Sequence, residues 1–143
     1  MSHDPFFIGV LRLAPDDIDS SMLVVQSKNF AFYDREGVIW RANAGDRVGG
    51  AHIPAVLKPV FGRSFQEPTL RAAVLHDIYC ASKVRTWRAT TTMFYWALIT
   101  AGVSVTKAHL MWAGVYGYYL FGPHWPGPLP PSVNMPPVLT VLK

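Results

Sequence analysis

The sequence predicts an α+β fold, with a small N-terminal antiparallel sheet followed by three helices and an extended Pro-rich C-terminal arm. Three observations predict this order. β-branched and aromatic residues dominate the first third of the chain. Longer apolar segments of helical character follow between residues 68 and 120. The stretch after Gly122 is too rich in proline to form a helix. For a chain of 143 residues we expect a single domain over 1–122 and an arm over 123–143.

The strands are expected in the first 42 residues. Residues 6–13 and 22–26 are candidate strands. Residues 29–33 and 38–42 flank the short loop Asp34-Arg35-Glu36-Gly37. A short loop that ends in glycine is typical of a hairpin with a glycine bulge. This hairpin is the best-defined strand pair that the sequence predicts.

The helices are expected after a glycine- and proline-rich loop over residues 44–62. Their predicted ranges are 68–83, 89–101 and 104–120, with Ser104 as the N-cap of the third. The third helix is apolar on nearly all sides, so we expect it to be central or covered by a partner. The arm also carries apolar residues, which favours docking on a neighbouring subunit over a solvated tail, with packing on its own domain as the alternative.

Composition limits the classes of partner. Half of the residues are hydrophobic and 15% are charged, which indicates surface buried against other proteins. The net charge of +4 comes from scattered residues. The one local basic cluster, Lys83, Arg85 and Arg88, is interpreted as a solvated helix end, so nucleic-acid binding is not favoured.

Membrane insertion and secretion are not favoured either. The uncharged stretches 90–106 and 110–122 are each shorter than the roughly 20 apolar residues of a membrane span. Buried helices are therefore preferred over a membrane hairpin. The N-terminus has no basic segment followed by a long apolar one, so we expect no signal peptide. The single cysteine, Cys80, excludes an internal disulfide and is expected to be a buried thiol.

The residues that point to chemistry are His76 and Asp77, within the first predicted helix. On a helical wheel Asp77 falls in the middle of an apolar arc and His76 lies at its edge. The arc consists of Leu70, Ala73, Val74, Ile78, Cys80 and Ala81. A carboxylate in such an arc is costly unless it is paired, hydrogen-bonded or bound to a metal.

Two interpretations of this pair remain open. In a catalytic or metal site, His76 acts as a general base or ligand, with Asp77 and His52 as further ligands and Tyr79 as a nearby hydrogen-bonding group. In a structural site, Asp77 accepts N–H bonds from the Gly49–His52 loop. Adjacent helix residues diverge by about 100°, so Asp77 is not expected to orient His76.

These segments together resemble domain-of-unknown-function family 1353, found in phages, prophages and bacteria. The resemblance covers roughly residues 29–122. It lies in the loop Gly49-Gly50-Ala51-His52-Ile53-Pro54, the helix segment Ala72–Tyr79, and the later segments Met93–Leu98 and Ala101–Ser104. The family layout also looks like that of secreted phospholipase A2, in which a glycine-rich calcium loop precedes a His-Asp helix; this comparison is an analogy.

The chain departs from the family pattern at three positions. The family's loop Asp is Gly49 here, its loop Ser is His52, and its later helix Asp is Thr91. Loss of the loop carboxylate weakens the case for calcium, which prefers several oxygen ligands. A set of His52, His76 and Asp77 would instead suit zinc. We expect no cofactor, with zinc or calcium as the metals to consider.

The resemblance, the apolar composition and the arm together favour a structural protein of a phage particle, in the tail or tail tip, located in the virion. Its partners would be other virion subunits, bound through the arm and the apolar surface. Its His-Asp site would then be vestigial or retuned, and Gly49, Gly50 and His52 would support it. The alternative is a hydrolase acting on cell-envelope lipid or peptidoglycan through His76. An enzymatic function is therefore the less favoured hypothesis.

Overall fold

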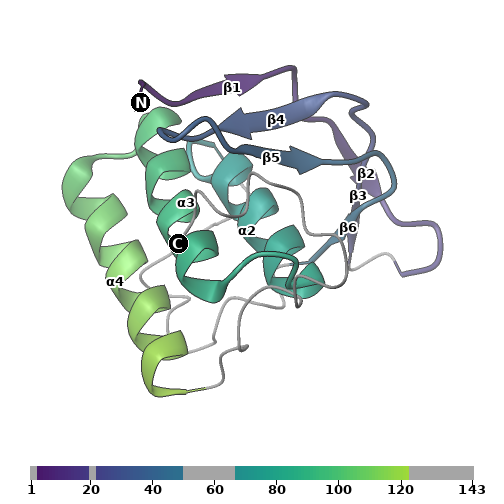
Figure 1. Ribbon diagram of the computed structural model, residues 1–143. Helices are drawn as coiled ribbons and strands as arrows, with labels where there is room; N and C mark the ends of the chain where they lie inside the picture. The colour runs from purple at the N-terminus through teal and green to yellow at the C-terminus, as the bar shows by residue number, and fades with distance from the viewer. Residues whose placement is uncertain (1–2, 20–21, 50–66, 123–143) are drawn as a thin grey trace, which may run out of the picture.

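The computed structural model describes residues 3–19, 22–49 and 67–122. Six short strands are followed by three helices, as the sequence predicts for an α+β fold (Figure 1). The strands are β1 (Phe6–Ile8), β2 (Leu13–Pro15), β3 (Leu23–Val25), β4 (Phe30–Tyr33), β5 (Ile39–Ala42) and β6 (Arg47–Val48). The helices are α2 (Leu70–Ser82), α3 (Trp87–Thr100) and α4 (Val105–Phe121). The predicted arm, 123–143, lies outside the described residues.

The strands form two three-stranded antiparallel sheets, ordered β1-β4-β5 and β2-β3-β6, where the sequence predicts one. Of the predicted strand 6–13, only Phe6–Ile8 forms a strand of the first sheet. It ends at Gly9, whose φ of 75° lies in the left-handed region that suits glycine, and β2 begins only at Leu13. The chain thus passes from the first sheet to the second between β1 and β2. The predicted loop 44–62 also contributes a short strand, β6, which pairs with β3.

The predicted hairpin is confirmed as β4 and β5, with Phe32 opposite Trp40. Its loop is stabilised by Asp34, whose Oδ1 accepts the backbone N–H of Glu36 and Val38 at 2.9 and 3.0 Å. The Oδ2 atom of Asp34 accepts the indole N–H of Trp40 at 2.9 Å. This carboxylate thus holds both the turn and the first core aromatic of β5.

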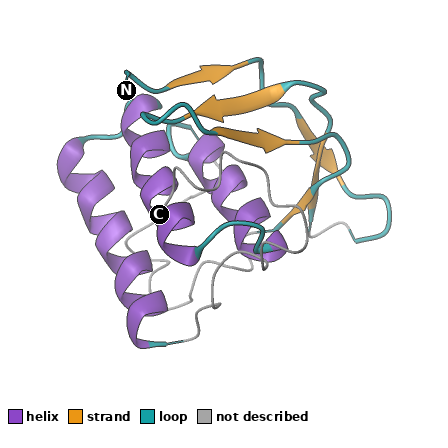
Figure 2. Cartoon of the chain, viewed as in Figure 1, coloured by secondary structure: helices purple, strands orange, loops and turns teal. Residues whose placement is uncertain are grey.

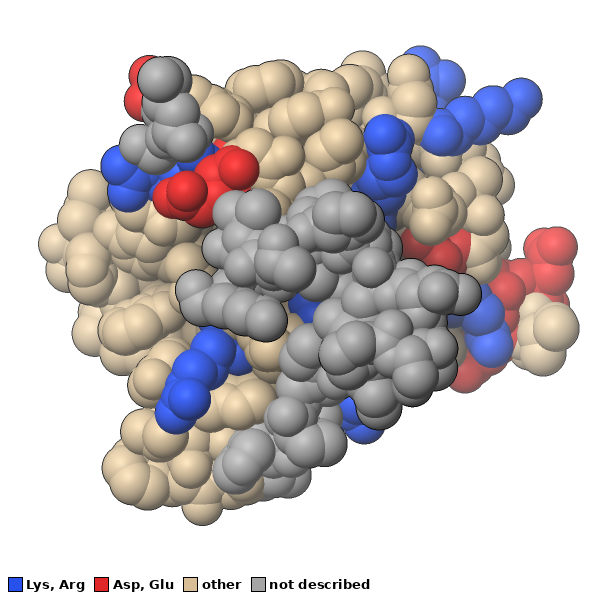
Figure 3. All heavy atoms as spheres, viewed as in Figure 1, with Lys and Arg blue, Asp and Glu red and all other residues tan. Residues whose placement is uncertain are grey.

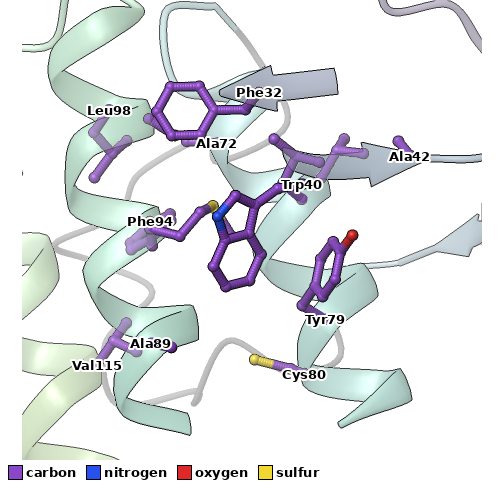
Figure 4. Close-up of a cluster of buried hydrophobic side chains, with 14 of the residues drawn as sticks. Phe32, Trp40, Ala42, Ala72, Tyr79, Cys80, Ala89, Phe94, Leu98 and Val115 are labelled. Carbon is purple, nitrogen blue, oxygen red and sulfur yellow. The ribbon is translucent and has the colours of Figure 1, made fainter. Parts of the chain in front are cut away.

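The three helices lie on one side of the two sheets (Figure 2). The middle of the stack is α3, which contacts α2 and α4. The core fills the space between β4, β5 and the helices, where Phe32, Trp40 and Phe94 are among the buried side chains (Figure 4). Ser104 caps α4 as predicted, since its hydroxyl accepts the Lys107 N–H at 3.2 Å.

Of the two alternatives for the third helix, a central place is not what the described residues show, and cover by a partner stays a prediction. α4 lies at the edge of the fold against α3 (Figure 1), and the central helices are α2 and α3. Its inner face buries Ala108, Met111, Val115 and Tyr119. Its outer face is solvent-exposed although it is apolar, because the apolar residues of α4 extend all round the helix while α3 covers one side.

Candidate functional site

The His-Asp pair lies on α2, which packs against α3 on one side and against β5 and β6 on another. Both side chains are buried: 1% of His76 and 4% of Asp77 is exposed. The predicted apolar arc is correct in part, since Ala73, Val74 and Cys80 are buried with Asp77, but His76 is fully buried rather than at an edge. Ala72, Leu75 and Tyr79, outside that arc, are also buried, whereas Ala81 is exposed. A helical wheel assumes one solvent face, but α2 is a central helix with apolar neighbours nearly all round.

Asp77 faces the sheet that contains β6. Its Oδ2 atom accepts the backbone N–H of Gly49 at 3.2 Å, directly after β6 ends. The expected contact between the carboxylate and the glycine loop is present at this residue. Gly49 has little free space, because a Cβ there would lie 3.3 Å from Cε of Met22. Gly49, the residue that the resemblance aligns with a loop aspartate, is thus closely packed.

His76 faces α3 and α4, away from the Gly49 contact. The Nε2 atom of its imidazole lies 3.4 Å from Sγ of Cys80, one helical turn later. The ring centroids of His76 and Phe94 are 4.6 Å apart, and that of Tyr119 is 6.5 Å away. The two adjacent residues therefore serve different interfaces, in line with the predicted divergence of about 100°.

Cys80 and Tyr119 complete a buried polar cluster with His76. The Tyr119 hydroxyl donates to Sγ of Cys80 at 3.6 Å. Burial raises the pKa of the Cys80 thiol to about 12, and burial also raises the pKa of Tyr119. At neutral pH the sulfur is therefore an uncharged thiol and a poor nucleophile, unlike the low-pKa cysteines of catalytic Cys-His pairs. The predicted buried thiol is confirmed.

This cluster was missed in the sequence because it joins α2 to α4. The spacing of His76 and Cys80, four residues apart on one helix, was the available signal. Nothing in the sequence identified Tyr119 as the third member, since it lies 39 positions beyond Cys80.

Tyr79 contacts the sheet rather than His76. Its hydroxyl accepts the backbone N–H of Arg41 in β5 at 2.9 Å. Its ring meets that of Trp40 edge-on, with centroids 4.8 Å apart (Figure 4). The expectation that Tyr79 serves the histidine site is therefore replaced by a role in joining α2 to β5.

Arg85 is buried, so the interpretation of Lys83, Arg85 and Arg88 as a solvated helix end is wrong for this residue. Its guanidinium lies 4.5 Å from the Trp40 ring centroid and donates to the Ile39 carbonyl at 3.0 Å. Burial lowers the pKa of Arg85 from its usual value. Lys83 and Arg88 are exposed. On the face in Figure 3 the basic residues are dispersed rather than gathered into one patch.

The metal set that the sequence suggests cannot be assembled from the described residues. Gly50 and His52 lie outside them. Within the described ranges, no three His, Cys, Asp or Glu side chains gather closely enough to hold a metal ion. Thr91, which the resemblance aligns with a later helix aspartate, is buried in α3, where its hydroxyl donates to the Trp87 carbonyl at 2.7 Å. The zinc set of His52, His76 and Asp77 stays a prediction.

The side chains of this region connect elements of the core. Asp77 holds the start of the glycine loop, Tyr79 and Arg85 join α2 and the α2–α3 connection to β5, and His76 fills an aromatic junction of three helices. No helix in the described ranges is long and apolar enough to cross a membrane.

A family model described as "Protein of unknown function (DUF1353)" matches residues 24–115, which is more than half of the chain. The chain therefore belongs to this family, as the sequence motifs predict. The match spans β4, β5, β6, α2 and α3 completely and ends within α4.

Two curated relatives, both from Sinorhizobium fredii, are similar to this chain. The uncharacterized protein y4iH is 36% identical over 119 residues, covering 83% of this chain and 48% of the relative. The uncharacterized protein y4jT is 37% identical over 109 residues, covering 76% of this chain and 32% of the relative. The chain thus spans half or less of the length of these relatives. No solved structure matches it.

Proposed function

We propose that this protein is a structural component of a phage particle, in the tail or tail tip, and that its His-Asp pair has a structural role. The observation that carries the second part is the burial of both side chains in separate interfaces. Only 1% of His76 is exposed, against an uncharged thiol and a phenylalanine ring. A general base must reach its substrate or a water molecule, and this imidazole has little access to either.

The apolar outer face of α4 supports the first part of the proposal. Leu110 is 59% exposed and Phe121 is 89% exposed, on a helix without charge from 108 to 121. A Cβ on Gly117, between them on the same face, would meet no atom within 4 Å. Exposed apolar surface of this kind marks sites of contact with other proteins. A particle subunit would cover it with its neighbours, and the arm over 123–143 would add to that contact.

Assembly in particles tests the proposal. Particles are purified from a host that expresses tagged protein, either complete or lacking residues 126–143, and the tag is measured in the particle fraction. A second variant, Leu110→Ser with Phe121→Ser, tests the α4 face. Ile18→Ser is the matched control, since Ile18 is 90% exposed on the β2–β3 connection, away from α4. We expect incorporation of the complete protein and the control, with loss in the other two.

Absence of the complete protein from particles would overturn the proposal. Incorporation that is unaltered in the 126–143 deletion would overturn the role of the arm, and unaltered incorporation of the serine pair would overturn that of the α4 face.

A hydrolase acting on envelope lipid or peptidoglycan is the second candidate. It is favoured by one observation, the placement of His76 and Asp77 in the same turn of α2 beside the start of a glycine-rich loop. Its test is cleavage of phospholipid vesicles and of purified peptidoglycan by the protein and by His76→Ala. Cleavage that the substitution abolishes, in a variant that still folds, would favour the enzyme. Cleavage that survives in His76→Ala would rule out this residue as the base.

A further inference from the structure

A hollow of about 370 Å³ lies where the chain passes between the two sheets. Residues 9–12 run from β1 in one sheet to β2 in the other, and residues 26–29 return from β3 to β4. The hollow is lined by these two linkers, through Val10, Arg12, Gln26, Ser27, Lys28 and Asn29. It is separate from the His76 and Asp77 contacts, which involve the helices and β6.

The walls of this hollow are fixed by hydrogen bonds between the linkers. The hydroxyl of Ser27 donates to the Val10 carbonyl and accepts the Arg12 N–H, both at 2.6 Å. The Gln26 N–H donates to the Arg12 carbonyl at 2.8 Å. These bonds hold the two backbones together, so the side chains of both linkers project from a rigid support.

The residues that line the hollow carry positive charge and no negative charge. Arg12 and Lys28 contribute two cations, and no carboxylate lines the hollow. Within residues 3–19, 22–49 and 67–122, neither cation forms an ion pair. An adjoining hollow of about 300 Å³ differs in this respect, because its Arg71 is paired with Glu67 at 3.2 Å. Of these two neighbouring hollows, only the one between the linkers keeps its cations available.

We propose that the hollow between the linkers binds a phosphate group. A phosphate carries about −1.5 to −2 charge at pH 7 and matches the two cations. Its oxygens accept bidentate hydrogen bonds from a guanidinium such as that of Arg12, and a point charge such as Lys28 is also a common phosphate ligand. The side-chain amides of Gln26 and Asn29 add neutral donors. A single carboxylate has fewer acceptor oxygens than this set of donors can use.

Titration of the complete, isotope-labelled protein with inorganic phosphate tests the site by nuclear magnetic resonance, at constant ionic strength in chloride. We expect saturable shifts centred on the amides of residues 10–12 and 26–29. Arg12→Gln with Lys28→Gln is expected to weaken binding at least about tenfold, since charge-assisted hydrogen bonds are lost. The matched control removes the same charge elsewhere, at the exposed residues Arg41 and Lys107.

The outcomes distinguish a site from general charge attraction. Shifts that do not saturate, or equal weakening in the Arg41→Gln, Lys107→Gln control, would overturn the proposal, as would acetate binding as tightly as phosphate. Glycerol 3-phosphate separates two sources of the ligand. Binding at least as tight as that of inorganic phosphate indicates a phosphate monoester, whereas weaker binding indicates the free ion, and either result upholds the site. Thermal unfolding shows whether the double variant still folds; if it does not, Lys28→Gln alone must weaken binding.

Discussion

The backbone N–H of Gly49 donates a hydrogen bond to Oδ2 of Asp77, with the two atoms 3.2 Å apart. This bond connects the end of β6 to the middle of α2. The residue before Asp77 faces the opposite way, since His76 contacts Cys80, Phe94 and Tyr119. Two neighbouring polar side chains therefore fix two different interfaces of one central helix. This division explains how both can be buried without interacting as a catalytic dyad.

Replacing Asp77 should lower stability. Asp77→Ala leaves the Gly49 N–H without this acceptor and should reduce the free energy of unfolding by about 1–3 kcal/mol. Asp77→Asn keeps a carbonyl oxygen in place and should cost less. Urea denaturation measures both, and amide hydrogen exchange at Gly49 should accelerate in Asp77→Ala. Asp17→Ala at an exposed position is the control and should stay within about 0.5 kcal/mol of the unaltered protein. A loss no larger in Asp77→Ala than in this control would contradict the structural role.

Cys80 should make stability depend on alkaline pH. Its folded pKa of about 12 exceeds the ordinary 9.0, so the folded state keeps the thiol proton longer than the unfolded state does. This contribution is fully present below pH 9 and is lost as the pH rises from 9 toward 12. Tyr119, whose pKa is also raised, acts in the same direction. Denaturation at several pH values should show a shallower alkaline loss in Cys80→Ala than in the unaltered protein.

The same burial predicts low reactivity of this thiol. Cys80 is the only cysteine of the chain, so a thiol reagent reports on it alone. At pH 8 the folded protein should react about tenfold more slowly than the urea-unfolded protein. In the folded state little of the sulfur is ionised to the reactive thiolate, and the reagent cannot reach it. Equal rates in the two states would show that the sulfur is accessible.

Much of the fold follows from local sequence signals. The β4–β5 hairpin was predictable because its loop ends in Gly37, which has a φ of 80°. Ser104 and Gly102 predict the start of α4 and the end of α3 to within a few residues. The division into two sheets was not predictable, because the chain leaves β1 at Gly9 within a run of strand-forming residues and starts β2 only at Leu13. β6 was missed because it has two residues and depends on pairing with β3.

The site was predictable where it depends on local geometry. The divergence of His76 and Asp77 follows from the helical repeat, and the Gly49 contact followed from the cost of a buried carboxylate. The surroundings of His76 and Arg85 were not predictable, since they depend on packing between elements distant in the sequence. Arg85 contacts Ile39, 46 positions away.

Arg85 should be more important for stability than its charge indicates. Its guanidinium covers the Trp40 ring and its Nη2 donates to the Ile39 carbonyl. Arg85→Ala removes both contacts and should cost about 2–4 kcal/mol in urea denaturation. Arg85→Lys keeps the charge but not the planar group, so it should recover only part of the loss. Arg41→Ala, on the exposed face of β5, is the control. Full recovery by lysine would show that charge alone matters.

The two glycines Gly9 and Gly117 should respond to alanine with opposite signs. At Gly9, with a φ of 75°, a Cβ would lie 2.9 Å from the backbone oxygen of Asn29, so Gly9→Ala adds a clash to backbone strain. We expect a loss of at least about 1–2 kcal/mol. At Gly117, within α4, a Cβ meets no atom within 4 Å, and alanine is favoured over glycine in a helix by about 1 kcal/mol. Gly117→Ala should therefore raise the midpoint of thermal unfolding while Gly9→Ala lowers it. Since both substitutions add one methyl group, a shared sign would contradict the packing described for these two positions.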